Sequence, residues 1–182
     1  MSAILETTEA LPAGAWGLDA VHSRVGFAVD YLVGTFRGTF SPFAATLAVD
    51  EHGRATLAGE AEVASIKVEE PNLLGHLLAP DFFDAERTPD VRFTSTDVRL
   101  AGGEARVRGE LTLRGTTHEI ELTGSASGPV TDPYGRERLG LRLATVVDRT
   151  QFGLQWNTPL PNGRKALADE VTLEAELFFV KE

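Results

Sequence analysis

Residues 105–113, Ala105-Arg-Val-Arg-Gly-Glu-Leu-Thr-Leu113, alternate small or apolar side chains with charged or polar ones. Successive side chains of a β-strand point to opposite faces of its sheet, so this alternation predicts a strand with one buried face and one solvated face. The same period of two recurs through most of the chain. The sequence therefore predicts an antiparallel all-β protein.

Eight segments have this pattern or the composition of a strand, and they are residues 25–31, 39–49, 57–66, 91–100, 105–113, 118–122, 139–143 and 171–177. Several are joined by short turns that supply the Gly or Asp a tight reversal needs: Asp50-Glu-His-Gly53, Ala101-Gly-Gly103 and Arg114-Gly-Thr-Thr117. Strands joined this way pair in sequence. Eight of them can close into a barrel without exposed edges, and a two-sheet sandwich is the alternative architecture.

Two connections are too long for hairpins. In residues 67–90, Pro71 suits a first helical turn, four leucines at positions 73, 74, 77 and 78 share one face, and Pro80 ends the pattern, which predicts a short helix capping a barrel mouth. Residues 148–170 contain Phe152, Leu154 and Trp156, more apolar weight than a solvated loop carries. We expect these side chains either to belong to a functional loop, to pack on the outside of the barrel, or to contact a second copy in a homodimer.

The composition limits the classes of partner. The chain has 182 residues, enough for one domain, and its net charge of −10 leaves no basic stripe for nucleic acid. It has no cysteine, and no apolar run approaches the ~20 residues of a membrane span. Residues 1–10 have glutamates where an export signal has basic residues. We expect a cytoplasmic protein whose residues 1–15 form a flexible tail.

The usual catalytic constellations are missing. The four histidines have no metal-ligand spacing, and His118, between apolar neighbours of a strand, is typical of a hydrogen-bonded core residue. Gly124-Ser-Ala-Ser-Gly128 has Ala126 where a nucleophile elbow has serine, and is expected to be a strand end. Asp81 and Asp84 are placed to cap backbone amides, with acid–base chemistry as the alternative. We expect no catalytic residue, no metal and no cofactor.

Four motifs occur in order along the chain: Asp19-Ala-Val-His-Ser23, Ala79-Pro-Asp-Phe-Phe-Asp84 with its continuation to Thr96, Gly109-Glu-Leu-Thr-Leu-Arg-Gly115 and Asp148-Arg-Thr-Gln-Phe-Gly153. In these motifs the chain resembles the YceI family of bacterial proteins, from about Trp16 to Val180. The resemblance implies a lipocalin-like barrel over residues 16–182, extended and flattened, that binds polyisoprenoid lipids. One position departs from the family pattern, because Leu73 and Leu74 stand where many members have an Arg-Asp pair.

These observations favour a non-enzymatic protein that holds a long isoprenoid chain, a polyprenyl lipid or an isoprenoid quinone, inside the barrel. An isomerase or hydrolase on the same barrel and a stress-related interaction domain with a packed lumen are the alternatives. Phe82 and Phe83 are expected either to line the portal or to plug the barrel mouth. The residues expected to contact the ligand are Phe27, Val29, Leu73, Leu77, Phe82, Phe83, Phe93, Leu111, Ile120, Leu141, Phe152 and Trp156, with polar contacts from His22 and His118.

Overall fold

The computed structural model describes residues 11–182, so most of the expected tail, residues 1–10, lies outside the described residues. Gly14 and Ala15 belong to the first strand. The strands are β1 (Gly14–Leu18), β2 (Arg24–Tyr31), β3 (Gly34–Phe40), β4 (Ala44–Val49), β5 (Ala55–Glu62), β6 (Ile66–Lys67), β7 (Asp90–Ala101), β8 (Glu104–Leu113), β9 (Thr116–Thr131), β10 (Glu137–Asp148) and β11 (Leu167–Lys181). The helices are α1 (Pro71–Leu78) and two 3₁₀ turns, η1 (Val63–Ser65) and η2 (Arg149–Phe152).

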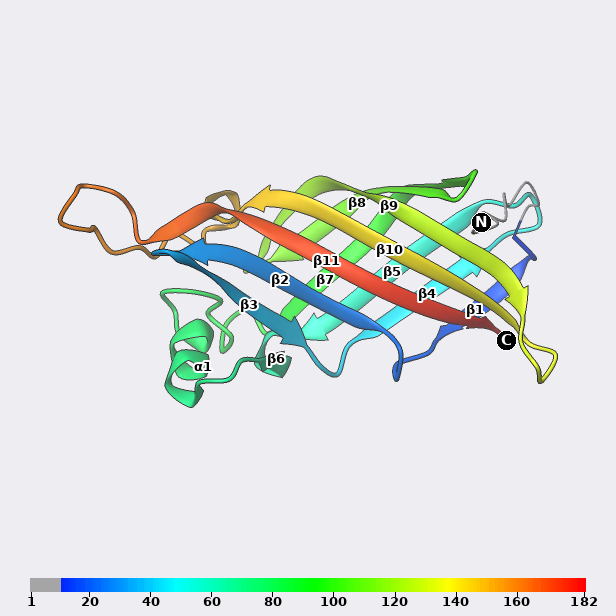
Figure 1. Cartoon of the computed structure of the whole chain (residues 1–182), viewed down its shortest axis with the longest axis horizontal. Coiled ribbons are helices and arrows are strands. Elements are labelled where there is room, and N and C mark those ends of the chain that lie inside the picture. Colours follow the sequence, from blue (N-terminus) through cyan, green and yellow to red (C-terminus); the bar gives the residue numbers. More distant parts are fainter. Residues whose placement is uncertain (1–10) are drawn as a thin grey trace.

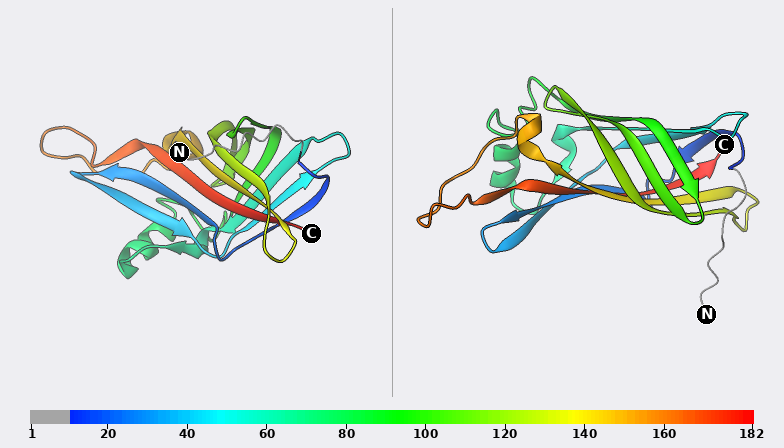
Figure 2. Two further views of the ribbon diagram at one scale, coloured as in Figure 1. Left: turned by 45° about the vertical axis from the view of Figure 1, so that its right-hand side comes forward. Right: turned by 90° about the horizontal axis from the view of Figure 1, so that it is seen from above.

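Eight antiparallel strands form a closed ring in the order β1-β4-β5-β7-β8-β9-β10-β11 (Figure 1). The pairing of Trp16 in β1 with Lys181 in β11 closes it. This confirms the expected eight-stranded lipocalin-like barrel with a short helix and excludes the sandwich. The ring is elongated, and α1 lies at one end of it, as the views in Figure 2 also show.

β11 pairs with two strands along the same edge. Its last residues pair with β1, whereas residues 167–176 pair with β2, which continues into β3 and the two-residue β6. Beyond the ring, the sheet therefore opens into a branch of β2, β3 and β6. We call the end that β1 closes the packed half, and the end formed with this branch the hollow half.

The strands differ from the expectation in several places. β1 and β6 were not expected, and β9 and β10 extend beyond residues 118–122 and 139–143. Three further differences have a local cause. Residues 39–49 form two strands, because Ser41, Pro42 and Phe43 interrupt the ladder and proline has no N–H to donate. Residues 57–66 end as a strand at Glu62 and turn into η1. Residues 124–128 are the interior of β9 and not its end, because Gly124 lets β9 approach β10: a Cβ there would collide with the carbonyl oxygen of Arg142.

The interior consists of two apolar clusters, one in each half. In the packed half Trp16, Leu141 and Phe179 are fully buried. In the hollow half the cluster includes Val63, Ile66, Leu77 and Phe152. Phe93 and Ile120 contact both clusters, so the two halves share one continuous apolar interior.

α1 begins and ends where the sequence predicts. The carboxylate of Glu70 accepts hydrogen bonds from the amides of Asn72 (3.2 Å) and Leu73 (2.8 Å), and Pro71 occupies the first turn. The helix stops before Pro80, and Leu77 is its buried residue. The cap and the apolar contacts of Leu73, Leu74 and Leu77 together hold the helix.

An ionic cluster holds the turns at the packed end. Asp132, in the β9–β10 turn, accepts hydrogen bonds from the amides of Tyr134 (2.9 Å) and Arg136 (3.0 Å) and from Nε of Arg138 (2.8 Å). Arg138 also donates to Asp19 in the β1–β2 turn at 3.2 Å. The amide of Arg136, then the guanidinium of Arg138, lower the pKa of Asp132 to about 2.

Replacing Asp132 by asparagine tests this cluster. Because the pKa of Asp132 is lowered from 3.8 to about 2, its contribution to the free energy of unfolding is present above pH 3.8 and is lost as the pH falls towards 2. We expect Asp132→Asn to be less stable than the parent at neutral pH, with a difference that narrows below pH 3.8. Urea unfolding over a pH series measures this difference in stability, with Asp81→Asn, at an exposed position, as the control. A difference that does not change with pH would contradict the assignment.

Candidate functional site

A cavity of about 440 Å³ lies inside the hollow half. Strands β2, β3, β8 and β11 form its wall, and α1 with the segments after it and after η2 covers it. The polar side chains on its described wall belong to Tyr31, His76 and Arg149. The other lining residues are apolar: Phe27, Val29, Phe36, Phe40, Leu73, Leu77, Phe82, Phe83, Val91, Leu111, Leu113, Val147, Leu154, Trp156, Leu167, Val171 and Leu173.

A second cavity of about 160 Å³ continues along the barrel interior towards the packed half. Phe40, Val91, Leu111 and Leu173 line both cavities and form the partition between them. The interior is thus a larger and a smaller apolar chamber in line along the barrel.

The structure brings most of the residues expected to contact a ligand to these chambers. Those on the larger cavity are Phe27, Val29, Leu73, Leu77, Phe82, Phe83, Leu111 and Trp156. Phe93 and Ile120 line the smaller one. Leu141 belongs to the packed half and Phe152 is buried against His118, so neither lines a chamber.

The two histidines expected to give polar contacts lie off the cavity wall. His22 is exposed in the β1–β2 turn, where its Nδ1 lies 2.8 Å from Oδ2 of Asp19. His118 shares the inward face with Leu111, but its Nε2 lies 2.9 Å from the carbonyl oxygen of Gln151 and its ring meets Phe152 edge-on. The imidazole on the cavity wall is that of His76.

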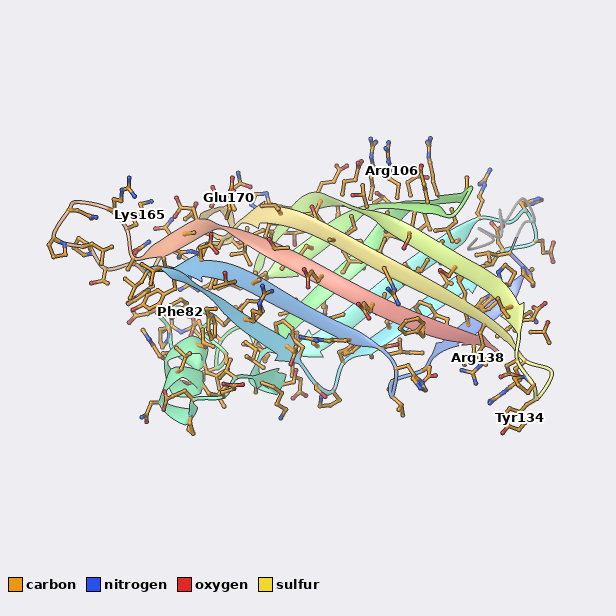
Figure 3. All side chains as sticks on the ribbon, viewed as in Figure 1. Phe82, Arg106, Tyr134, Arg138, Lys165 and Glu170 are labelled. Atoms are coloured by element: carbon orange, nitrogen blue, oxygen red, sulfur yellow. The ribbon has the colours of Figure 1, made fainter. Side chains whose placement is uncertain are left out.

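Three rings form an aromatic cluster over the cavity. The ring centroid of His76 lies 4.8 Å from that of Phe82 and 5.1 Å from that of Trp156, and the imidazole is edge-on to both rings. The ring centroids of Phe82 and Trp156 are 5.2 Å apart. Figure 3 shows Phe82 beside α1. The cluster joins the helix to the loop after η2, so the two parts of the cover contact each other directly.

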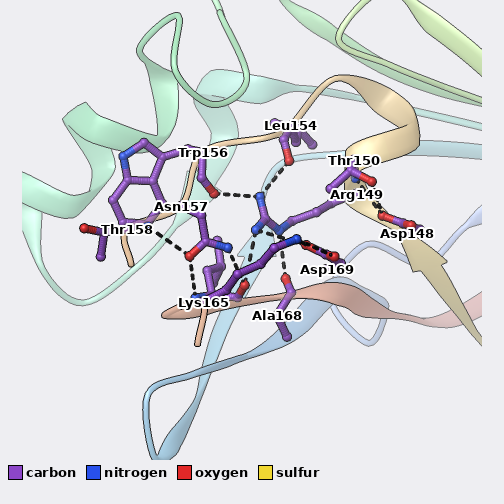
Figure 4. A network of polar contacts seen from close by, with 11 residues as sticks. Asp148, Arg149, Thr150, Leu154, Trp156, Asn157, Thr158, Lys165, Ala168 and Asp169 are labelled. Carbon is purple, nitrogen blue, oxygen red and sulfur yellow. Dashed lines mark hydrogen bonds and ion pairs between the residues drawn. The ribbon is translucent and has the colours of Figure 1, made fainter. Parts of the chain in front are cut away.

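Arg149 anchors the loop after η2 from beneath (Figure 4). Its Nε donates to the carbonyl of Ala168 (2.8 Å), and its terminal nitrogens donate to the carbonyls of Leu154 (2.6 Å), Trp156 (2.9 Å) and Leu167 (3.3 Å). The carboxylate of Asp169 lies 3.7 Å away. Burial lowers the pKa of this guanidinium, and the negative charge of Asp169 opposes that effect.

Arg114 ties the two covering segments to the β8–β9 turn. Its guanidinium donates to the carbonyl of Gly153 at 2.8 Å and to the carbonyl of Pro80 at 2.8 Å. Pro80 follows α1 and Gly153 follows η2. One side chain therefore holds both parts of the cover at the same end of the barrel.

The turn at Asp81 and Asp84 is held by its backbone. The amides of Phe82 and Asp84 donate to the carbonyl of Ala79, and the hydroxyl of Thr88 donates to the carbonyls of Phe83 and Asp84. Neither carboxylate accepts a hydrogen bond within residues 11–182, so the expected capping role is not observed. Asp81 is exposed and Asp84 has a positive φ of 52°.

No group of three or more potential metal ligands occurs within residues 11–182. A polar hollow of about 680 Å³ lies on the outer face of the sheet, where Arg24, Arg142 and Glu176 are neighbours across three strands. Charged side chains stand beside Phe27, Leu143, Ala144 and Ala175 in this hollow, unlike the apolar wall of the larger cavity. No helix in the described part is long and apolar enough to cross a membrane.

Sequence patterns did not identify Arg114, His76 or Arg149 as site residues. None of the three belongs to a pattern of catalytic or binding residues, and their roles depend largely on carbonyls or rings from other segments of the chain. Arg114 and Arg149 do fall inside the motifs at 109–115 and 148–153. The presence of an arginine in each of these two motifs was the only sequence signal that could have pointed to these residues.

Comparison with known proteins gives a consistent set of relatives. Residues 16–179 match the YceI-like domain. A UPF0312 protein of Staphylococcus epidermidis is 28% identical over 171 residues, which cover 90% of this chain and 96% of the relative. A UPF0312 protein of Pseudomonas fluorescens is 31% identical over 141 residues, covering 75% of this chain and 70% of the relative.

Solved structures have the same fold. BcnA of Burkholderia cenocepacia superposes with a TM-score of 0.75 at 20% identity, covering 88% of this chain and 98% of that one. A polyisoprenoid binding domain from Saccharophagus degradans, implicated in plant cell wall breakdown, superposes with a TM-score of 0.65 at 15% identity, covering 92% and 98%. The fold and the match over residues 16–179 agree, and the chain belongs to the family of YceI-like domains.

Proposed function

We propose that this protein binds one long isoprenoid chain, a polyprenyl lipid or an isoprenoid quinone, in the hollow half of the barrel without acting as an enzyme. The observation that carries the proposal is the apolar cavity of about 440 Å³, within the range of roughly 300–1,000 Å³ found for small-molecule sites. The relative from Saccharophagus degradans is described as a polyisoprenoid binding domain, which supports the ligand class.

The energetics favour an apolar chain. Each buried methylene contributes roughly 0.8 kcal/mol, so about ten carbons exceed an association cost of about 4 kcal/mol. The aliphatic and aromatic wall contacts a chain of this kind without leaving polar groups unpaired. Discrimination between chains of similar width is expected to be weak, since each additional methylene changes the free energy of binding by a small amount.

The polar groups on the wall favour a neutral head group. Four of the five N–H donors of Arg149 bind carbonyl oxygens, and the carboxylate of Asp169, 3.7 Å from a terminal nitrogen, balances the charge of the guanidinium. This arginine therefore offers a ligand at most one donor and little net charge. Tyr31, His76 and the indole N–H of Trp156 are the other polar groups of the wall, and each can form a hydrogen bond suited to a carbonyl or hydroxyl. A diphosphate buried here would lack a compensating charge. A quinone or an alcohol fits the wall better.

The direct test is extraction of the ligand from protein purified from its native host. We expect organic extracts to contain a prenyl lipid or quinone in near-stoichiometric amount by mass spectrometry, and delipidated protein to take up an added prenyl quinone. Repeated preparations without lipid that also fail to take up prenyl quinone or polyprenol would overturn the proposal and favour a barrel with another role.

The substitution Val29→Trp distinguishes a binding chamber from a packed core. Val29 is buried in β2 and lines the larger cavity, so the added ring fills empty space. We expect the ligand-free variant to keep its melting temperature and to lose uptake of a prenyl quinone. The matched control is Val107→Trp in the packed half, where Val107 is fully buried and lines neither chamber, and overpacking costs about 1–3 kcal/mol. Equal destabilisation by both variants would contradict an empty chamber.

The substitution Arg149→Met tests the anchor of the cover. It removes the donor to the carbonyls of Leu154, Trp156 and Ala168, whereas the carbonyl of Leu167 keeps its bond from the side-chain amide of Asn157 (2.7 Å). We therefore expect a loss of about 3 kcal/mol in the free energy of unfolding and weaker ligand retention. Arg149→Lys should not restore stability, because an ammonium has three donors and no planar fork. The exposed Arg142→Met is the control. Urea unfolding measures the loss of stability, and the rate of ligand dissociation measures retention. An Arg149→Met variant with unchanged stability and retention would show that Arg149 does not anchor the loop.

A further inference from the structure

The turn between β2 and β3 presents two apolar side chains to solvent. Leu32 is 55% exposed and Val33 is fully exposed, at 106%. We call these two residues the apolar turn. Tyr31, directly before it, is also 40% exposed. Three consecutive large side chains at the end of a hairpin therefore expose much of their surface to solvent.

The fold does not require apolar residues there. Each of the other four hairpin turns in the described chain contains a glycine with positive φ: Gly53, Gly102 with Gly103, Gly115 and Gly135. In the apolar turn the positive φ of 54° belongs to Leu32, a conformation that glycine or asparagine adopts at lower cost. Backbone strain of this kind concentrates at functional positions. The turn is thus unfavourable for stability both in its conformation and in its exposed surface.

The apolar turn lies beside the cavity. Tyr31 lines the cavity and pairs with Leu167 of β11, which lines it too. The amide of Leu32 donates to the carbonyl of Ala166 at 2.9 Å, so the turn is fixed to the loop that precedes β11. Both project from the same end of the molecule in Figures 1 and 2. An apolar ligand entering at this end would pass the apolar turn.

The tip of this end carries two cations, although the net charge of the protein is −10. Residues 31–34 and 157–166 contain Arg164 and Lys165 and no carboxylate, and the carboxylates of Asp30, Asp169 and Glu170 follow behind the tip on β2 and β11. Both cations are exposed, and Figure 3 shows Lys165 on the projecting loop, where its ammonium also lies 3.0 Å from Asp169. Apolar side chains flanked by cations suit the boundary between acyl chains and anionic head groups.

We infer that the apolar turn inserts into the surface of a lipid bilayer, with Arg164 and Lys165 at the head groups, so that the apolar ligand passes between membrane and cavity without crossing water. This inference rests on the proposed function for its ligand. The net charge keeps the rest of the surface away from an anionic membrane, so the same charge distribution orients the molecule with this end towards the bilayer.

A single fluorophore reports insertion, because the chain has no cysteine. Val33→Cys labelled with nitrobenzoxadiazole should shift to shorter wavelength with vesicles of phosphatidylcholine containing a minor fraction of phosphatidylglycerol, and lipids with a quencher in the acyl chain should quench it. The matched control is Val21→Cys in the β1–β2 turn, 88% exposed, which should not respond. Equal responses, or none at Val33, would overturn the inference. A response without vesicles that grows with protein concentration would assign the turn to a second copy instead.

Transfer kinetics separate this inference from the proposed function. The double variant Leu32→Asn with Val33→Ser should take up a prenyl quinone from detergent solution as the parent does, and should extract it from vesicles at least about tenfold more slowly, since the apolar anchor is lost. Val21→Ser is the control. Unchanged extraction by the double variant would overturn membrane docking and leave ligand binding intact. Failure of the parent to bind quinone from detergent, with insertion at Val33 retained, would overturn the proposed function alone.

Discussion

The divided pairing of β11 is the constraint on which the rest of the structure depends. One edge of this strand can bond to a single partner at each position, and here β1 occupies its final residues while β2 occupies residues 167–176. Where β1 pairs, the ring closes and its side chains meet across the axis. Where β2 pairs, the sheet continues into β3 and β6 and does not return to the ring, so α1 and two loops must cover the opening. The packed half and the hollow half therefore both follow from the way in which β11 divides its pairing between β1 and β2.

A cover made of loops needs partners for the carbonyls of its backbone. Arg149, on the cavity wall, and Arg114, in the β8–β9 turn, donate to carbonyls of the segments that form the cover. Arginine suits the role because its planar fork reaches several carbonyls and keeps its charge when partly buried. Burial of the Arg149 guanidinium costs free energy of desolvation, and this cost accompanies a cover whose backbone carbonyls are hydrogen-bonded. Fully buried side chains stabilise both halves, Trp16 and Phe179 in the packed half and Ile66 and Phe152 in the hollow half.

The alternation of side chains located the sheet because a period of two is a local property of each strand. β1 was missed, since it is short and contains Gly14 and Gly17, which weaken the pattern. The cavity could not be predicted from the strands themselves: Leu111 and Leu141 have the same alternating context, yet one lines the chamber and the other is packed. Whether an inward side chain borders a cavity depends on which side chains lie opposite it across the barrel axis. The roles of Arg149 and His76 depend in the same way on contacts that no local pattern contains.

The contact between β1 and β11 joins residues 16–18 to residues 179–181, almost the full length of the domain. During synthesis the ring therefore cannot close until residues 179–181 have left the ribosome, and one edge of β1 and the edge of the unfinished sheet stay unpaired until then. Pairings of such large sequence separation form slowly, because the entropy of loop closure is lost before the contact is gained. Loss of the pairing between residues 16–18 and 179–181 would thus leave the ring open, and a chaperone would have most to protect in the interval before β11 emerges.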